Sequence, residues 1–267
     1  MSLFATPLRY ARIAAQLARM GVVRKTQFRV EFASQVIMDC VWYAAKIAVF
    51  EILFLYTGDL AGWSLKDIRV FLGFVFVSDA FMMMWLGARW RFGQDLKDGK
   101  LDPFRVRPAS TAFLYFFQQF SPEAALNMVV ACSYLGFGLH AADRLGAWSS
   151  LPMLAWAIAL CWWAMTAMTV FFSTIEFHVL SSDISSFLTH AFDPAATNPL
   201  DIFGARLRLF FLYLLPVGVL AHVPASMVLG RYDVFDGLIH TAWMLAFGSM
   251  AFALWNRGFR RYESAMS

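Results

Sequence analysis

The sequence predicts an all-α polytopic membrane protein, with six transmembrane helices in a single domain over residues 1-267. Hydrophobic residues make up 60% of the chain and charged residues only 15%. Soluble domains carry about 25% charged residues, because they must coat their surface with charge. The apolar residues also gather into runs long enough to cross about 30 Å of hydrocarbon as helices.

Residues 1-30 predict an amphipathic helix at the membrane surface. The cations Arg9, Arg12 and Arg19 recur at helical spacing on one face. Apolar residues repeat on another face, at Tyr10, Ile13, Leu17 and Met20. Such a helix lies in the interface with its cations in water. We expect Gly21 to end it.

Six apolar spans follow. We expect them at residues 34–56, 69–88, 122–139, 151–173, from 203 to about 216, and 235–255. The mixed segment 174–198 predicts the inner end of the fourth span and then a helix on the cytoplasmic surface. Pro216, Gly218 and Pro224 interrupt the next apolar run, and broken backbone is tolerated at membrane depth only where protein or water covers it. Residues 216-230 therefore predict an outer re-entrant segment.

The most charged stretch is residues 89-110, between the second and third spans. Its six cations are Arg89, Arg91, Lys97, Lys100, Arg105 and Arg107. Pro103 and Pro108 prevent a helix from running through it. Because cationic loops stay in the cytoplasm, this loop orients the chain with both termini cytoplasmic. A solvated inside loop with no further role is the alternative.

The remaining cations agree with this orientation. Seventeen lie on the predicted cytoplasmic side, including Arg206 and Arg208 ahead of the fifth span. The predicted outer positions hold Lys66, Arg69, Arg144 and Arg231. The basic balance therefore reflects membrane orientation, and we expect membrane lipid and no nucleic acid as a partner.

The first two spans contain four ionisable residues, Asp39, Lys46, Glu51 and Asp79. A lone charge at the bilayer centre costs about 2.5–3.5 kcal/mol on insertion scales, so each residue needs a partner or water. Lys46 and Asp79 lie about ten residues into oppositely directed helices, which places both near mid-membrane. We predict that they pair and hold the two spans together. Alternatively, Lys46 snorkels or meets Asp39 on its own helix.

Motifs for catalysis are missing from the sequence. It has no phosphate-binding GK[ST] loop, no HExxH, no GxSxG and no CxxC pair, so we expect no catalytic residue, no metal site and no cofactor in this chain. Cys40, Cys132 and Cys161 lie in apolar runs and are interpreted as packing residues.

Two histidines and three methionines complete the set of candidate residues. His178 and His190 are too far apart in sequence to form a helical pair, and we expect them at helix interfaces. Met82, Met83 and Met84 are candidates to line an adaptable apolar path.

The run DGKLDPFRVRPAS resembles a motif of type-2 ATP-binding-cassette (ABC) exporter permeases, in which a Gly-x-Leu-Asp turn leads into an Arg-Pro pair. The matching positions are Gly99, Leu101, Asp102, Arg107 and Pro108. Residues 198–231 are similar to the entry and exit of the fifth span in the same family. The matching positions there are Pro199, Leu200, Ile202, Phe203, Gly204, Arg208, Pro216, Pro224, Ala225, Leu229 and Gly230. The polar residues within the first span depart from the family pattern.

The resemblance implies a permease subunit that moves a substrate outward across the bacterial cytoplasmic (inner) membrane. A dimer of separate ABC ATPase subunits would bind ATP and Mg, and a second six-span permease, of the same or a homologous chain, would complete the pore. Residues 89-110 would be the coupling loop to the ATPase, and residues 1-30 the connecting helix. The implied ATPase-coupling residues are Asp95, Leu96, Lys97, Asp98, Gly99, Lys100, Leu101, Asp102, Arg107 and Pro108.

Two other classes of function stay open at this point. A membrane-embedded enzyme would gather ionisable groups at one depth, as Asp39, Lys46 and Asp79 do on a small scale, and would act without an ATPase. A channel or scaffold protein would need no coupling loop, and scrambling residues 95–102 would leave it unharmed.

Overall fold

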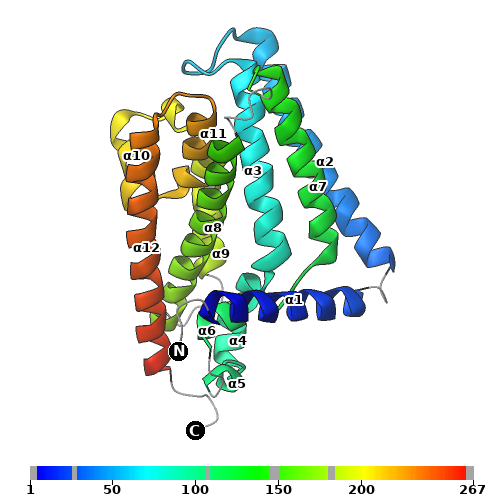
Figure 1. Ribbon diagram of the computed structural model, residues 1–267, viewed down its shortest axis with the longest axis vertical. Coiled ribbons are helices and arrows are strands. Elements are labelled where there is room, and N and C mark those ends of the chain that lie inside the picture. The colour runs from blue at the N-terminus through cyan, green and yellow to red at the C-terminus, as the bar shows by residue number, and fades with distance from the viewer. Residues whose placement is uncertain (1–4, 26–28, 106–108, 145–150, 180–183, 263–267) are drawn as a thin grey trace.

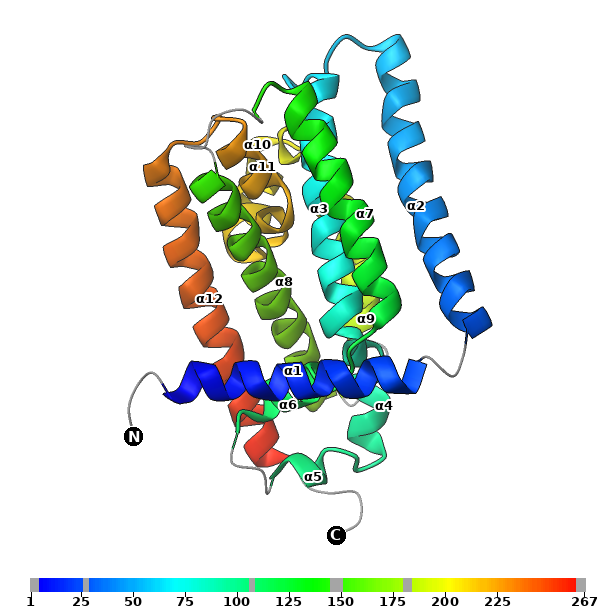
Figure 2. The same ribbon diagram turned by 45° about the vertical axis from the view of Figure 1, so that its right-hand side comes forward.

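Long helices form a bundle, and one helix crosses this bundle near one of its ends (Figure 2). The computed structural model describes residues 5–25, 29–105, 109–144, 151–179 and 184–262. These residues form helices and no β-strand. The long helices are α2 (Arg29–Tyr56), α3 (Leu65–Trp85), α7 (Pro122–Ala141), α8 (Leu151–Val179) and α12 (Val234–Arg261).

Four of these helices are long and apolar enough to cross a membrane: α3, α7, α12 and residues Leu151–Phe177 of α8. The fifth, α2, is 28 residues long and carries Asp39, Lys46 and Glu51. The all-α class predicted from composition is therefore confirmed for the described part of the chain.

Short helices project from one end of the bundle, which we call the loop end. They are η1 (Gly87–Arg91), α4 (Phe92–Lys97), α5 (Asp102–Arg105) and α6 (Thr111–Phe116). The helix α1 (Ala5–Lys25) runs across the long helices at the loop end, and the end of α12 extends past it (Figures 1 and 2). Pro103 was predicted to prevent one helix from running through the loop. It lies at the second position of α5, a separate short helix, which agrees with that prediction.

Along α1, the two predicted faces differ in exposure only in part, because Met20 of the predicted apolar face is exposed. Arg9, Arg12 and Arg19 are exposed, whereas Tyr10 and Ile13 are partly buried. The predicted helix end at Gly21 is wrong, because α1 continues to Lys25. Glycine is required there for close approach: a Cβ at Gly21 would lie 2.5 Å from the carbonyl oxygen of Phe120.

The stretch predicted as the fifth span is folded differently. Helix α9 (Ile184–Ala196) returns into the bundle beside α8, instead of lying on the surface. The chain then continues through short elements at the opposite end of the bundle, which we call the far end (Figure 1). These elements are η3 (Leu200–Ile202), α10 (Ala205–Leu209), the π-helical turn η4 (Phe210–Leu214), η5 (Val217–Leu220) and α11 (His222–Val228).

The sequence pattern of α9 explains the difference. Leu188, Phe192 and Ala195 recur at helical spacing and pack against the main hydrophobic core. Its polar residues, which suggested an exposed surface helix, face an internal cavity described below. Pro199 and Pro216 then prevent one straight helix from completing the crossing.

This arrangement also moves two cations. Arg208 pairs with Asp201 through Nη1 at 2.6 Å and hydrogen-bonds to Tyr232 just ahead of α12, so it belongs to the far end. Arg206 lies in the same short helix, α10. The prediction that both lie on the same side as the charged loop is therefore wrong.

Glycines allow the long helices to approach closely. A Cβ at Gly73 of α3 would lie 2.7 Å from the Cα of Leu135 in α7, and one at Gly138 would lie 2.9 Å from the backbone of Arg69. Between α8 and α12, Gly248 similarly accommodates the indole of Trp163. These glycines therefore permit close packing of α3 with α7 and of α8 with α12.

Candidate functional site

The loop-end helices are organised around the carboxylate of Asp95. Although charged, Asp95 is 6% exposed. Its Oδ2 accepts a hydrogen bond from the Tyr115 hydroxyl at 2.9 Å, and its Oδ1 accepts one from Lys100 Nζ at 3.2 Å. Burial and the Asp95 charge raise the pKa of Tyr115, which keeps this phenol a hydrogen-bond donor. Asp95 therefore fixes the shape of the loop and is not its contact surface.

A second set of loop residues points outward. Asp98 accepts hydrogen bonds from Lys100 at 2.9 Å and Gln94 at 2.7 Å, and these bonds lower the pKa of the Asp98 carboxyl. Gly99 turns the chain with a φ of 71°, a left-handed conformation that glycine adopts without strain. Lys97 and Lys100 are both exposed. These two cations are exposed beside Asp98 on the outer side of the turn.

Apolar residues beneath this turn connect it to the bundle. Leu96 and Leu101 are buried, and Phe92 packs against four aromatic rings with centroids 4.9–6.1 Å away. Those rings belong to Tyr115, Phe116, Phe177 and Trp255. Because Phe177 is in α8 and Trp255 is in α12, this aromatic cluster joins the loop to two long helices.

Two further contacts brace α6, the last helix of the loop. Trp255 Nε1 donates to Thr111 Oγ1 at 3.1 Å. From the other side, the hydroxyl of Tyr10 in α1 accepts a hydrogen bond from the Ser110 amide at 3.0 Å, and its ring packs edge-on against Phe113. The loop is thus held by α1, α8 and α12 together.

The structure therefore brings together most of the predicted coupling residues. Asp95, Leu96 and Leu101 form the buried part, and Lys97, Asp98 and Lys100 form the exposed part. Asp102 starts α5. Arg107 and Pro108 lie outside the described residues.

The intramembrane polar residues have other partners than predicted. Lys46 Nζ donates to Thr197 Oγ1 at 3.3 Å and lies 5.4 Å from the Trp42 ring centroid. It forms no ion pair with Asp79 or Asp39, so the predicted Lys46–Asp79 pair is wrong. The reason is that Thr197, at the end of α9, reaches the side of α2 where Lys46 projects.

Glu51 and Asp39 each bond to a different helix. Glu51 pairs with Arg69 of α3 at 2.8 Å, and Asp39 accepts a hydrogen bond from Asn127 of α7. Ionic contact between the first two predicted spans therefore exists, but toward the far end and between different residues.

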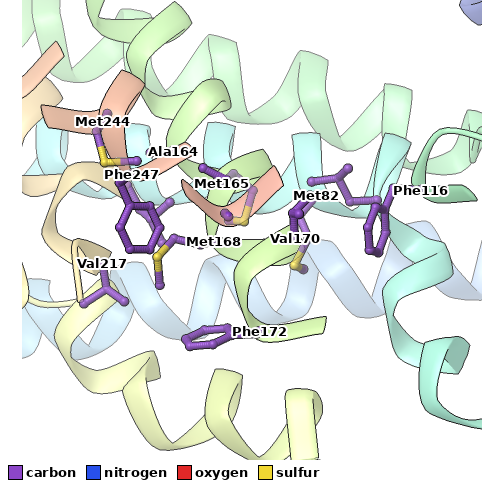
Figure 3. Close-up of a cluster of buried hydrophobic side chains, with 14 of the residues drawn as sticks. Met82, Phe116, Ala164, Met165, Met168, Val170, Phe172, Val217, Met244 and Phe247 are labelled. Atoms are coloured by element: carbon purple, nitrogen blue, oxygen red, sulfur yellow. The ribbon is translucent and has the colours of Figure 1, made fainter. Parts of the chain in front are cut away.

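Asp79 lies at a cavity of about 480 Å³ between α2, α3, α8 and α9, which we call the acidic cavity. Its walls include three carboxylates, those of Asp39, Asp79 and Asp193, and one guanidinium, that of Arg89. Met82 and Met83 line it as predicted for an apolar path. Figure 3 shows other parts of its apolar wall, Met165, Met168 and Phe172 of α8 and Val217 of η5.

Arg89 was predicted as a loop cation, but it is 7% exposed and closes the loop end of the cavity. Its Nη2 donates to Thr189 Oγ1 at 2.6 Å, and its guanidinium lies 4.4 Å from the Trp90 ring centroid. The imidazole of His190 stacks on the Trp90 ring, with 5.7 Å between the ring centroids. His190 thus contacts a residue of another helix but is exposed, so the expected interface position is met only in part, whereas the side chain of His178 lies outside the described residues.

Sequence reasoning missed Asp193 and Thr197 as lining residues. The available signal was an amphipathic 13-residue helix whose polar face carries Thr189 and Asp193, followed at the same spacing of four by Thr197, just after the helix ends. The periodicity gives the face, but not whether that face meets water, lipid or a cavity. Among the described residues, the acidic cavity included, no three His, Cys, Asp or Glu side chains are grouped as metal ligands.

The helical bundle, its apolar spans and the braced loop at one end define a multi-pass membrane protein. Residues 40–266 match the family model of the ABC-2 family transporter protein, and the chain belongs to this family. It is therefore a membrane permease of an ABC transporter. Searches of curated proteins and of solved structures found no match.

Proposed function

We propose that this chain is the membrane-spanning subunit of an ATP-driven exporter in a bacterial cytoplasmic membrane. A dimer of separate ABC ATPase subunits docks on the loop end and binds ATP and Mg, and a second six-span permease, identical or homologous, faces this one. Both termini lie in the cytoplasm in this arrangement, since α1 and the end of α12 flank the loop.

The structure of the loop carries the proposal. Lys97 and Lys100 project from a turn that a buried carboxylate holds rigid, and an aromatic cluster connects this turn to α8 and α12. A partner that presses on the exposed turn therefore moves two long helices directly. A loop that only bridged two spans would have no need of this bracing.

The helix α1 supports the same function. It lies in the plane expected for the membrane surface and contacts the loop through Tyr10. Movement of the docked ATPase would thus reach the bundle along two routes, through α1 and through α6.

The test is purification of the tagged full-length chain in mild detergent from its own host. Copurified proteins are identified by mass spectrometry, and ATP hydrolysis by the preparation is measured. We expect an ABC ATPase with a phosphate-binding loop to copurify. A Lys97→Glu/Lys100→Glu variant should lose this ATPase while it still inserts and purifies.

The matched control is Lys66→Glu, which changes an exposed cation at the far end. It should retain the ATPase. If the ATPase binds the loop variant as well as the control, the loop is not the docking site. If no ATPase accompanies the unmodified chain, the exporter function is wrong.

A further inference from the structure

The charge inside the acidic cavity is unbalanced. Asp39 from α2, Asp79 from α3 and Asp193 from α9 project to one space, against the single guanidinium of Arg89. The Lys46 ammonium, which lies on the same helix as Asp39, is not part of the lining and donates to Thr197 at one side of the cavity. The cavity walls therefore carry an excess of carboxylates at membrane depth.

Such an excess does not stabilise the fold. Each ionisable group within the hydrocarbon costs about 2.5–3.5 kcal/mol, and like charges that share a low-dielectric space repel each other. Asp39 is partly compensated by Asn127. Neither Asp79 nor Asp193 forms an ion pair with a described cation, and Asp79 and Arg89 attract each other only across a distance. Intramembrane carboxylates with this arrangement indicate a binding function.

The rest of the wall is apolar and adaptable. The rings of Trp42, Phe172 and Phe192 line it, and five methionines supply flexible, polarizable surface. Aromatic faces attract cations, and methionine-rich walls adjust to ligands of different shape. A volume of about 480 Å³ is that of a site for a drug-sized molecule.

The cavity also has an entrance. Trp42 is 37% exposed and Asp193 is exposed, so the space opens between α2 and α9. Arg89 closes its loop end through Thr189 and Trp90. A ligand would therefore place its positive centre between the carboxylates, with its apolar groups against the aromatic and methionine side chains.

We infer that the acidic cavity is a substrate site for amphipathic organic cations. This inference rests on the proposed function, because it names the class of molecule that the exporter carries. Anionic and neutral compounds of the same size are expected to bind more weakly, since they leave the carboxylates uncompensated.

The experiment compares two ions of equal shape and opposite charge. Radiolabelled tetraphenylphosphonium and tetraphenylborate are each equilibrated with the purified full-length chain in detergent, and unlabelled ion is added to define displaceable binding. We expect saturable binding of tetraphenylphosphonium only. Asp79→Asn and Asp193→Asn should each raise its Kd about tenfold, the equivalent of roughly 1.4 kcal/mol.

The matched control is Asp59→Asn, an exposed carboxylate at the far end, which should leave the Kd unchanged. If Asp79→Asn does not fold, Asp193→Asn still tests the site, because Asp193 is exposed on α9. Equal binding of both ions, or unchanged Kd in the Asp193 variant, would overturn the inference.

The same preparations separate this inference from the proposed function. If the ABC ATPase copurifies but tetraphenylphosphonium does not bind saturably, the cation site is wrong and the exporter function stands. If the cation binds with the expected dependence on Asp193 and no ATPase is found, the site stands and the exporter function is wrong.

Discussion

Arg69 of α3 donates hydrogen bonds from Nε and Nη2 to the two carboxylate oxygens of Glu51 in α2, at 2.8 and 3.0 Å. The two side chains are 23% and 37% exposed. Bidentate geometry makes such a pair strong and directional. Because α2 carries the most charged residues of any long helix in the described chain, this pair is important for holding α2 to the bundle.

Arg69→Met should therefore destabilise the protein. We expect a loss of about 1–2 kcal/mol, between the values for an exposed pair and a fully buried one, because Glu51 loses its partner. The midpoint of thermal unfolding in detergent measures it. Glu51→Gln combined with Arg69→Met should cost less than the two single changes together, and simple additivity would show that the pair is energetically unimportant.

Tyr115→Phe should loosen the loop without altering its surface. The change removes the hydroxyl that donates to Asp95, so a buried carboxylate loses a hydrogen bond, at a cost of about 1.5–3 kcal/mol. We expect faster protease cleavage within residues 95–104 and weaker ATPase binding. Phe117→Leu, at a partly buried ring of the neighbouring turn, is the control. Identical cleavage rates in the two variants would argue against a scaffold role for Asp95.

Gly73→Leu should separate α3 from α7. A Cβ at this position already lies 2.7 Å from the Leu135 Cα, so the larger side chain requires backbone movement, and overpacking costs about 1–3 kcal/mol. Lower yield of monodisperse protein in size-exclusion chromatography is expected. Gly136→Leu is the matched control, because nothing lies within 4 Å of a Cβ there. Equal yields would mean that the α3–α7 contact is less tight than the structure indicates.

The far end should respond to acid through His222. Burial lowers the pKa of His222 to about 4, and its Nδ1 accepts a hydrogen bond from the Leu200 amide. The unfolded chain, with a pKa of about 6.5, then binds the proton more readily than the folded protein. Stability is therefore fully present above about pH 6.5 and falls as the pH is lowered toward 4, by up to roughly 3 kcal/mol.

Thermal unfolding at pH 7.5 and pH 5 measures this effect. His222→Asn keeps an acceptor for the Leu200 amide and should reduce the difference between the two pH values. His140→Asn, at an exposed histidine, should leave the difference unchanged. An unaltered pH dependence in the His222 variant would assign the effect to other groups.

The sequence was sufficient to predict most of the long helices but not their polar contacts. Apolar runs located α3, α7, α8 and α12, because burial in lipid requires a continuous apolar stretch whatever the neighbours are. The partner of Lys46 is 151 residues away in sequence. Asp79 was predicted as its partner from membrane depth alone. Depth gives no information on the direction in which each side chain leaves its helix, so the prediction failed.

The error at α9 has a related cause. Its serine, threonine and aspartate residues suggested water; Thr189 and Asp193 instead line the acidic cavity, with Asp193 at its open side. A polar helix face has the same sequence pattern in both settings. The loop was easier to predict, because its charge, glycine and prolines determine its local conformation without reference to distant elements.

Helix α12 joins the two ends of the molecule in one uninterrupted element. Asp233 and Asp236 cap its start at the far end, and Trp255 anchors its other part to α6. Its 28 residues measure about 42 Å. A helix of this length that is held near both ends acts as a lever arm: a tilt of a few degrees at the loop displaces the far end by several ångströms, with no relay of side-chain rearrangements in between.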